Sequence, residues 1–213
     1  MVEFRFVAFL DVLGFSEMVQ ADFESAGENQ NLRNLEEALG AVEPKGEGVQ
    51  ALQFSDSIVL SSSFDPSVSS LQVIVNASKS LQLRLFQSGI LIRGGIAHGR
   101  HYHAGSFLFS QALIDAYRLE AISARFPRVV ISRETISLIG NSLQNTLVDY
   151  DDLQFVDFLE GATSEEVQNG FTACTRSLAA SSSVEEKRDW LARYTSFKFS
   201  GAAIKPKKMR RAV

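Results

Sequence analysis

The chain has 213 residues, of which 45% are hydrophobic and 22% are charged, a composition that supports one globular domain or a domain with an extension. Its 21 basic and 25 acidic residues give a net charge of −4, which argues against a general nucleic-acid-binding surface. The single cysteine, Cys174, excludes an internal disulfide, and no apolar stretch reaches the roughly 18 residues that a membrane span needs. Because the N-terminus also lacks a signal-peptide pattern, we expect a cytoplasmic protein without membrane contact.

The first half of the chain predicts strands and helices that alternate without an internal repeat. In chain order they are a buried strand over residues 3–10, two helices within 15–40 separated near 27–29, a loop over 44–48, a hairpin with strands 49–53 and 57–62, and a helix that begins near Ser63 or Asp65 and ends at Gln87. Gly14 allows a tight turn after the first strand, and the hairpin turns at Ser55 and Asp56.

The second half continues with another hairpin, further helices and short strands. We expect a strand over 90–97, a short turn at Gly99, a strand within 101–109, a helix over 113–120, a strand over 129–131, a helix from Ser132 to Gly140, one or two strands within 148–159, and helices over 164–179 and 183–197. The basic segment 205–211 is typical of a solvated chain end, and contact with phosphates or a partner is the alternative.

The order of the elements up to residue 144 is therefore βααββαββαβα. Hairpins combined with long helices favour an α+β fold, with an antiparallel-rich sheet and helices on one face.

Two aspartates occupy unusual places in this pattern. Asp11 follows the first buried strand, and Asp56 stands between two apolar strands of a hairpin. A carboxylate between hydrophobic segments is costly to desolvate unless it is paired or binds a cation. The pair therefore suggests a divalent-metal site for phosphoryl chemistry, although turn and capping roles are also open to aspartate.

Four segments in chain order carry a resemblance to a known family. They are Phe9-Leu10-Asp11-Val12-Leu13-Gly14-Phe15, Phe54-Ser55-Asp56-Ser57, Ile92-Arg93-Gly94-Gly95-Ile96-Ala97-His98-Gly99 and Ala112-Leu113-Ile114-Asp115-Ala116-Tyr117-Arg118-Leu119-Glu120. This series resembles the motifs of class III nucleotidyl cyclases, and the compact chain is most similar to the pyrimidine cyclases of the bacterial Pycsar antiphage systems. The resemblance implies a ferredoxin-like catalytic core over 1–144, with 145–213 as a strand and helical extension of the same domain that ends in the basic tail.

The resemblance also implies a reaction and a set of site residues. Two divalent cations, Mn²⁺ or Mg²⁺, would be held by Asp11, Asp56 and the backbone carbonyl of Val12, and would activate the ribose 3′-hydroxyl for attack on the α-phosphate. Amides from Leu13 to Ser16 at a helix start would face phosphate oxygens, and Arg118 would stabilise the transition state across a homodimer interface. The residues assigned to substrate contact are Phe9, Leu13, Gly14, Phe15, Arg93 and Tyr117.

Departures from the family pattern bear on the substrate. Leu52 and Phe107 stand where purine cyclases carry charged or polar base selectors, and Ile114 stands where an asparagine usually precedes the transition-state arginine. Tyr117 or Gln53 would then serve a smaller ring. We expect a uridylate cyclase in preference to a cytidylate cyclase, with the cyclic nucleotide acting as a second messenger on a separate effector during phage infection.

Each assignment has an alternative. Arg93 in an apolar strand is also explained by a buried salt bridge, and Arg118 by an intrahelical pair with Asp115. A zinc site at His98, His101 and His103 lacks a fourth ligand at a usual spacing. Cys174 is expected in the core. As whole-protein alternatives, the chain is a catalytically degenerate nucleotide-binding or dimerising module, or a metal-dependent phosphohydrolase.

Overall fold

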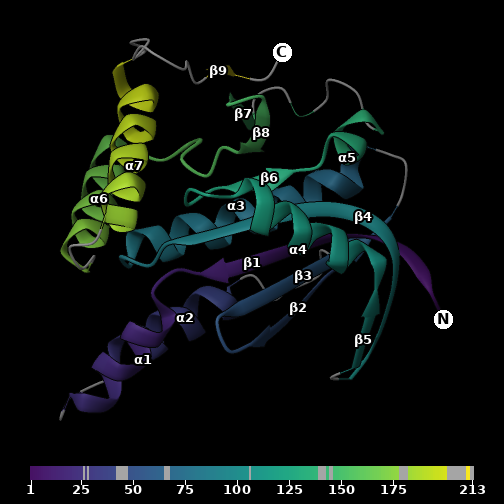
Figure 1. The fold of residues 1–213 in the computed structure, drawn as a ribbon, viewed down its shortest axis with the longest axis horizontal. Coiled ribbons are helices and arrows are strands. Elements are labelled where there is room, and N and C mark those ends of the chain that lie inside the picture. Colours follow the sequence, from purple (N-terminus) through teal and green to yellow (C-terminus); the bar gives the residue numbers. More distant parts are fainter. Residues whose placement is uncertain are drawn as a thin grey trace.

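The computed structural model describes residues 1–25, 27, 29–41, 48–64, 68–105, 107–138, 143, 146–177, 182–200 and 210–211. Its strands form one sheet in the order β2-β3-β1-β4-β6-β8-β7-β9, with β5 paired to β4 (Figure 1). The strands are β1 (Glu3–Val12), β2 (Val49–Phe54), β3 (Ser57–Ser63), β4 (Ile92–Ala104), β5 (Phe107–Ser110), β6 (Val129–Ile131), β7 (Leu147–Tyr150), β8 (Leu153–Val156) and β9 (Arg210–Arg211). The helices are α1 (Phe15–Glu24), α2 (Gln30–Gly40), α3 (Val68–Gln87), α4 (Gln111–Ser123), α5 (Arg133–Ser137), α6 (Ser164–Ser177) and α7 (Ser182–Ser200). The predicted α+β class and the order of elements through α5 are confirmed.

The central strand β1 is buried on both faces, and its residues alternate between two layers of core. Phe6, Ala8 and Leu10 belong to the cluster that α3 covers. Val7 and Phe9 pack with Ala112 and Ala116 of α4 on the other face. Figure 1 shows α3 behind β1 and β4 and α4 in front of them. The expectation of helices on one face was therefore wrong, because α4 has its own small-residue stripe that packs on the second face.

The strand after α3 is longer than the sequence predicted. The expected turn at Gly99 is absent, since β4 continues from Ile92 to Ala104 and Gly99 lies opposite Arg5 in the antiparallel ladder with β1. The chain turns instead at Gly105, whose φ of 59° favours glycine. Gly99 faces the start of α4, and a Cβ added to it would lie 3.4 Å from the nearest atom of Ala112, an ordinary van der Waals contact.

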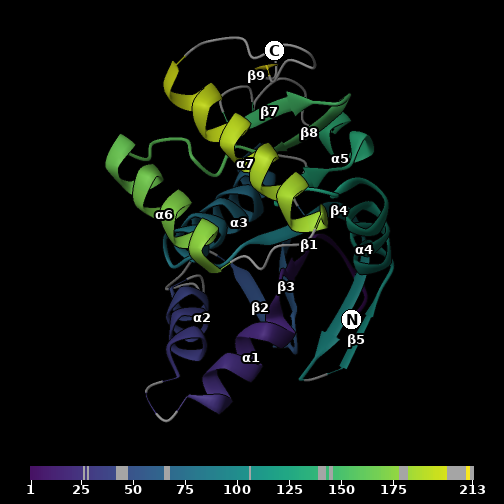
Figure 2. The ribbon, with the colours of Figure 1, turned by 60° about the vertical axis from the view of Figure 1, so that its left-hand side comes forward.

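The segment after residue 145 continues the same sheet. β8 pairs antiparallel with β6, and β7 pairs with β8. Helix α7 packs Trp190, Leu191 and Tyr194 against Phe155. Helix α6 lies beside α7 (Figure 2) and also packs against α3. Cys174 of α6 is buried against α3, where its Sγ donates to the carbonyl of Phe86 over 3.5 Å, which confirms the expected core position.

Several sequence predictions fall outside the described residues: the loop at 44–47, the cap at Asp65, the helix ends at Gly140 and at 178–179, and the basic tail over 205–209. Of the basic tail, Arg210 and Arg211 pair with Asp149 and Val148 of β7, so this part of the tail adds a strand at the sheet edge. No helix among the described residues is long and apolar enough to cross a membrane.

Candidate active site

The ends of β1 and of the β2–β3 hairpin bring Asp11 and Asp56 together. Asp11 lies opposite Ser57 in the β1–β3 ladder, and the Val12 N–H donates to the carbonyl of Asp56 over 2.8 Å. The hairpin turns through Ser55 at a φ of 53°, which places Asp56 beside the end of β1. The backbones of two segments that are distant in the sequence thus lie side by side at Asp11 and Asp56.

Asp11 faces the α4 side of the sheet, where Arg93 of β4 lies next to it. The two residues are cross-strand partners, and the Arg93 Nε–H donates to Asp11 Oδ2 over 2.9 Å. Nε of Arg93 also lies 2.7 Å from Oε1 of Glu120 on α4. The salt bridge considered for Arg93 is therefore present, although it is only partly buried, and it lies within the candidate site.

Glu120 is the residue of this group that sequence reasoning did not assign. It lies within the fourth resembling segment, and it is only 3% exposed although it is charged. Burial raises the pKa of Glu120, Arg93 acts to lower it, and Asp11 acts to raise it further. The sequence signal that could have found it is the spacing of four residues from Ala112 to Ala116 to Glu120, which places an acid in the buried stripe of α4.

Helix α1 begins directly after the end of β1. Gly14 precedes it with a φ of 75° and a ψ of 23°, and no side chain caps the helix start. The Leu13 N–H donates to the carbonyl of Leu91 over 2.8 Å, so among the amides assigned to phosphate contact this one is already bonded. The first-turn amides of Phe15 and Ser16 are better placed for an anion.

The outer surface of α4 carries the other predicted residues. Tyr117 packs edge-on against Phe9 with ring centroids 5.3 Å apart. The Arg118 side chain is 67% exposed and lies 3.8 Å from Asp115, the intrahelical pair considered from sequence. Among the described residues Arg118 makes no hydrogen bond or ion pair with Asp11 or Asp56. The structure thus joins Phe9 and Tyr117, and it leaves Arg118 directed outward.

The residues at the end of β1 fit a divalent cation. Carboxylate and carbonyl oxygens are the ligands that Mg²⁺ and Mn²⁺ prefer. Because the N–H and C=O of one strand residue point to the same neighbour, the Val12 carbonyl also faces the Asp56 turn. Among the described residues there is no group of three or more His, Cys, Asp or Glu side chains suited to a metal, so a site here depends on two carboxylates, backbone oxygen and substrate.

The histidines of β4 have protein partners. Nδ1 of His98 lies 2.9 Å from Thr135 Oγ1, and Nδ1 of His101 lies 2.9 Å from Ser110 Oγ. These contacts fix the rings structurally, and within the described part of the chain no third ligand joins them.

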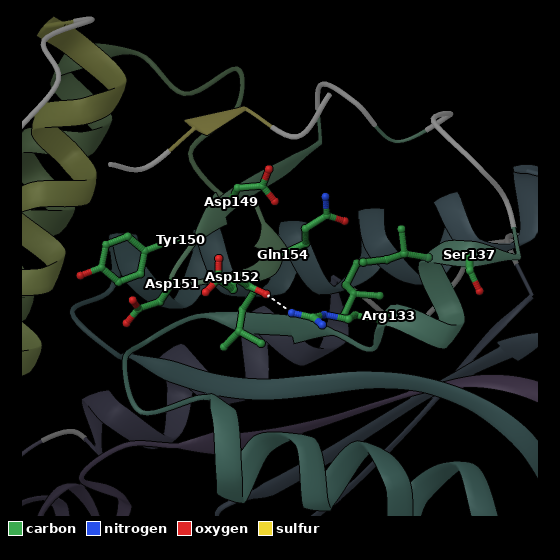
Figure 3. Close-up of a pocket in the computed structure, with 10 residues that line it drawn as sticks. Arg133, Ser137, Asp149, Tyr150, Asp151, Asp152 and Gln154 are labelled. Atoms are coloured by element: carbon green, nitrogen blue, oxygen red, sulfur yellow. Dashed lines mark hydrogen bonds between the residues drawn. The ribbon is translucent and has the colours of Figure 1, made fainter. Parts of the chain in front are cut away.

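A separate cavity of about 710 Å³ lies between α5 and the β7–β8 hairpin (Figure 3). Asp149, Asp151 and Asp152 contribute to its lining, and Arg133 Nη2 donates to the carbonyl of Asp152 over 3.0 Å. None of the predicted site residues lines this cavity, so its size alone does not make it the functional site.

The fold is that of class III nucleotidyl cyclase catalytic domains. The guanylate cyclase domain of RhGC from Catenaria anguillulae, in complex with GTP, aligns with a TM-score of 0.54 at 17% identity, over 73% of this chain and 97% of that domain. The dimeric guanylyl cyclase domain of the RhoGC fusion protein from the aquatic fungus Blastocladiella emersonii gives 0.52 at 16%, over 73% and 94%. The adenylyl cyclase CyaB from P. aeruginosa gives 0.51 at 18%, over 74% and 95%. No family profile and no curated protein matches the sequence.

Proposed function

We propose that this chain is a nucleotidyl cyclase that converts a pyrimidine nucleoside triphosphate, UTP in preference to CTP, to the 3′,5′-cyclic nucleotide and pyrophosphate. The observation that carries the proposal is the meeting of Asp11 and Asp56 at the end of β1 within this fold. The hydrogen bond from the Val12 N–H to the Asp56 carbonyl, which joins the two backbones, supports this assignment.

The proposed mechanism assigns a task to each of these groups. Two divalent cations, Mn²⁺ or Mg²⁺, would lower the pKa of the ribose 3′-hydroxyl and neutralise the leaving pyrophosphate. Asp11, Asp56 and the Val12 carbonyl would hold the cations, and the uncapped start of α1 would bind phosphate oxygens. The terminal N–H groups of Arg93, which make no hydrogen bond among the described residues, would bind the triphosphate.

Two apolar positions support a pyrimidine substrate. Leu52 is half-buried on β2, and Phe107 is exposed on β5, at the positions that the family resemblance assigns to purine selection. Neither side chain offers a charged contact to a purine edge. Tyr117 projects from α4 and Gln53 lies at the hairpin turn, where its Nε2 donates to the Ser55 carbonyl over 3.2 Å, so both are candidates for reading the smaller base.

The outward direction of Arg118 supports a homodimer with composite sites. Ile114, Tyr117 and Ile122 are large apolar side chains exposed on the same helix. Neighbouring exposed apolar side chains on one surface are typical of a protein interface. In a dimer through this surface, Arg118 of one protomer would reach the phosphates held by Asp11 and Asp56 of its partner and offset the charge of the transition state.

The direct test is incubation of the purified protein with ATP, GTP, CTP and UTP in separate reactions with Mn²⁺, followed by mass spectrometry. We expect cyclic UMP as the main product and none from an Asp11→Ala variant. A cyclic purine nucleotide as the main product would overturn the proposed base preference but would support the proposed cyclase activity. A nucleoside diphosphate or monophosphate in its place would indicate a phosphohydrolase.

The composite site has a test of its own. Asp56→Ala and Arg118→Ala chains should each be inactive, and a mixture should regain part of the activity because one site in each heterodimer is intact. Heterodimer formation is followed with two affinity tags. If heterodimers form and no activity returns, the sites are not shared between protomers.

A second candidate function is a nucleotide-binding module without turnover. It is favoured by Ile114, which lies exposed on α4 where the family resemblance expects an asparagine that helps the transition state. Binding of a nucleoside triphosphate in the presence of Mn²⁺ without any cyclic product would support this candidate.

The same proposal extends to the biological role. A cyclic pyrimidine nucleotide made in the cytoplasm would act as a second messenger for antiphage defence by activating a separately encoded effector. Direct contact between the cyclase and that effector is not required, since the diffusing product connects them. Accumulation of the cyclic nucleotide in infected cells that express the wild-type chain, and not the Asp11→Ala chain, tests this role.

A further inference from the structure

Arg93 is shared between two carboxylates from different parts of the chain. Its Nε–H donates to Asp11 Oδ2 over 2.9 Å, and Nε lies 2.7 Å from Glu120 Oε1. The Glu120 oxygen is buried and, among the described residues, accepts no hydrogen bond. The guanidinium therefore donates a hydrogen bond to Asp11 and forms an ion pair with Glu120, whose Oε1 could accept a hydrogen bond from it.

Glu120 lies close to Arg93 because the backbones of α4 and β4 approach each other closely at Gly95. A Cβ on Gly95 would overlap the Ala116 carbonyl oxygen and lie 3.1 Å from the Glu120 nitrogen, so α4 contacts β4 backbone to backbone. This approach places Glu120 above Arg93, two residues before Gly95 on the strand. A buried carboxylate adds little to stability compared with an apolar residue of similar size, so its presence calls for another explanation.

The position of Arg93 creates a competition at Asp11. The guanidinium occupies Oδ2, an oxygen of the carboxylate to which the proposed function assigns a divalent cation. A cation bound by the Asp11 carboxylate would lie close to the guanidinium on its Oδ2, and the two positive charges would repel each other. Movement of Arg93 away from Asp11 would relieve this repulsion, and an arginine side chain that is only 32% exposed then depends on its remaining partner, Glu120.

We propose that Glu120 is a positioning residue that takes over the Arg93 guanidinium when a divalent cation binds Asp11. Only the Nε–H of Arg93 makes a hydrogen bond within the described part of the chain, so its transfer to Glu120 keeps the terminal N–H groups available for the triphosphate. Glu120 thereby lowers the cost of metal binding and holds Arg93 in the site. The inference rests on the proposed role of Asp11 as a metal ligand.

The test is a double-mutant cycle read by Mn²⁺ binding without nucleotide, with free Mn²⁺ measured by electron paramagnetic resonance. Glu120→Gln should weaken Mn²⁺ binding by about 3- to 30-fold, because Arg93 then pairs with Asp11 alone. In an Arg93→Gln background the same Glu120→Gln change should have an effect of less than about twofold. Equal effects in both backgrounds, or no effect in either, would overturn the proposal, since they would indicate simple charge removal or no role.

A control variant and an independent measurement on the wild-type protein accompany this cycle. Glu134→Gln removes an exposed acid on α5 that does not contact Arg93 and should leave Mn²⁺ binding unchanged. Because Glu120→Gln changes a buried position, the wild-type protein gives a second measurement that needs no variant: the ¹⁵N-detected Arg93 Nε–H signal during a Mg²⁺ titration. We expect this proton to shift and stay protected from exchange, and its loss to rapid solvent exchange would overturn the transfer to Glu120.

The cycle separates this inference from the proposed function. Coupled Mn²⁺ binding in a chain that makes no cyclic product would sustain the role of Glu120 and reject the cyclase. Formation of a cyclic product together with Mn²⁺ binding that shows no coupling between Glu120 and Arg93 would support the cyclase and reject the role of Glu120.

Discussion

Arg93 joins three segments of the chain at a single side chain. It is held by β4, donates to Asp11 at the end of β1, and contacts Glu120 on α4. The resemblance of the sequence to cyclases assigned Arg93 to the triphosphate, and periodicity placed it in an apolar strand. Its dependence on Glu120 was not predictable, because the contact requires the distance between α4 and β4 to be known.

Asp56 offers the sharpest test of the site at the level of one residue. Asp56→Asn keeps the side-chain size and the 2.8 Å backbone hydrogen bond from Val12, but it removes the charge that a divalent cation needs. We expect initial rates of cyclic nucleotide formation to fall at least about 100-fold with little change in thermal unfolding. Asp189→Asn, an exposed acid on α7, is the matched control, and an Asp56→Asn rate equal to that of the control would contradict the metal role.

His101 makes stability depend on pH. Burial lowers the pKa of His101 from 6.5 to about 4, with further lowering from Arg5 and His103 and an opposing effect of Glu3. As pH falls from 6.5 toward 4 the unfolded chain binds the proton first, so the free energy of unfolding decreases over this window. Denaturant unfolding should show a loss of about 1–3 kcal/mol between about pH 7 and pH 4.5 in the wild type, relative to His101→Gln. Parallel pH profiles of the two proteins would rule out this titration.

At the scale of elements, the position of α4 depends on Gly95. Helix capping was readable from sequence, as at Ser132, whose Oγ accepts from the Thr135 N–H over 3.1 Å as the predicted opening of α5 required. The face of the sheet that α4 covers could not be predicted. Ala112 and Ala116 indicate that α4 packs closely on a sheet, but they do not indicate on which face.

Gly95→Ala tests this close approach. The added methyl would overlap the Ala116 carbonyl oxygen, so α4 must move away from β4 and Glu120 must move from Arg93. We expect a loss of stability of about 1–3 kcal/mol in denaturant unfolding, together with a lower rate of product formation. Gly40→Ala near the end of α2, where a Cβ meets nothing within 4 Å, should be neutral. Equal stabilities for the two variants would show that α4 adapts without strain.

At the scale of the molecule, α7 is attached through a buried polar network as well as an aromatic cluster. The Tyr194 hydroxyl donates to Asp157 Oδ1 over 2.5 Å and accepts from the Leu159 N–H over 3.2 Å, and Lys198 Nζ donates to Asp157 Oδ2. Trp190 stacks on Tyr194 with ring centroids 5.3 Å apart, and it is the single tryptophan of the chain. Its fluorescence therefore reports on the attachment of α7.

Tyr194→Phe should weaken this attachment. The change leaves the Leu159 N–H and part of Asp157 without a partner, which costs about 1–3 kcal/mol. Denaturant unfolding followed by Trp190 fluorescence measures the loss. Arg193→Ala on the exposed side of the same helix should stay within about 0.5 kcal/mol of the wild type. A Tyr194→Phe midpoint equal to that of the control would mean that packing alone fixes α7.

Dimerisation through α4 is the second prediction at this scale. Ile122 is 82% exposed, so Ile122→Glu should fold normally, while a charge within the proposed interface should separate the protomers and abolish product formation. Light scattering after size-exclusion chromatography gives the mass. Phe23→Glu on α1, also highly exposed, should remain dimeric and active. A dimer of undiminished activity with Ile122→Glu would place the interface elsewhere.

The sequence by itself determined the order of elements through α5, the α+β class and most helix and strand limits, and its family resemblance supplied the candidate roles of Asp11, Asp56 and Arg93. These features depend on local periodicity, turn residues and short motifs, all of which lie within a few neighbouring positions. The tertiary structure alone decided that β4 continues through Gly99, that α4 covers the second face of the sheet, and that Glu120 contacts Arg93. Each of these features depends on the distance between backbone segments that are far apart in the sequence. That distance is set by tertiary packing, which local sequence patterns do not predict.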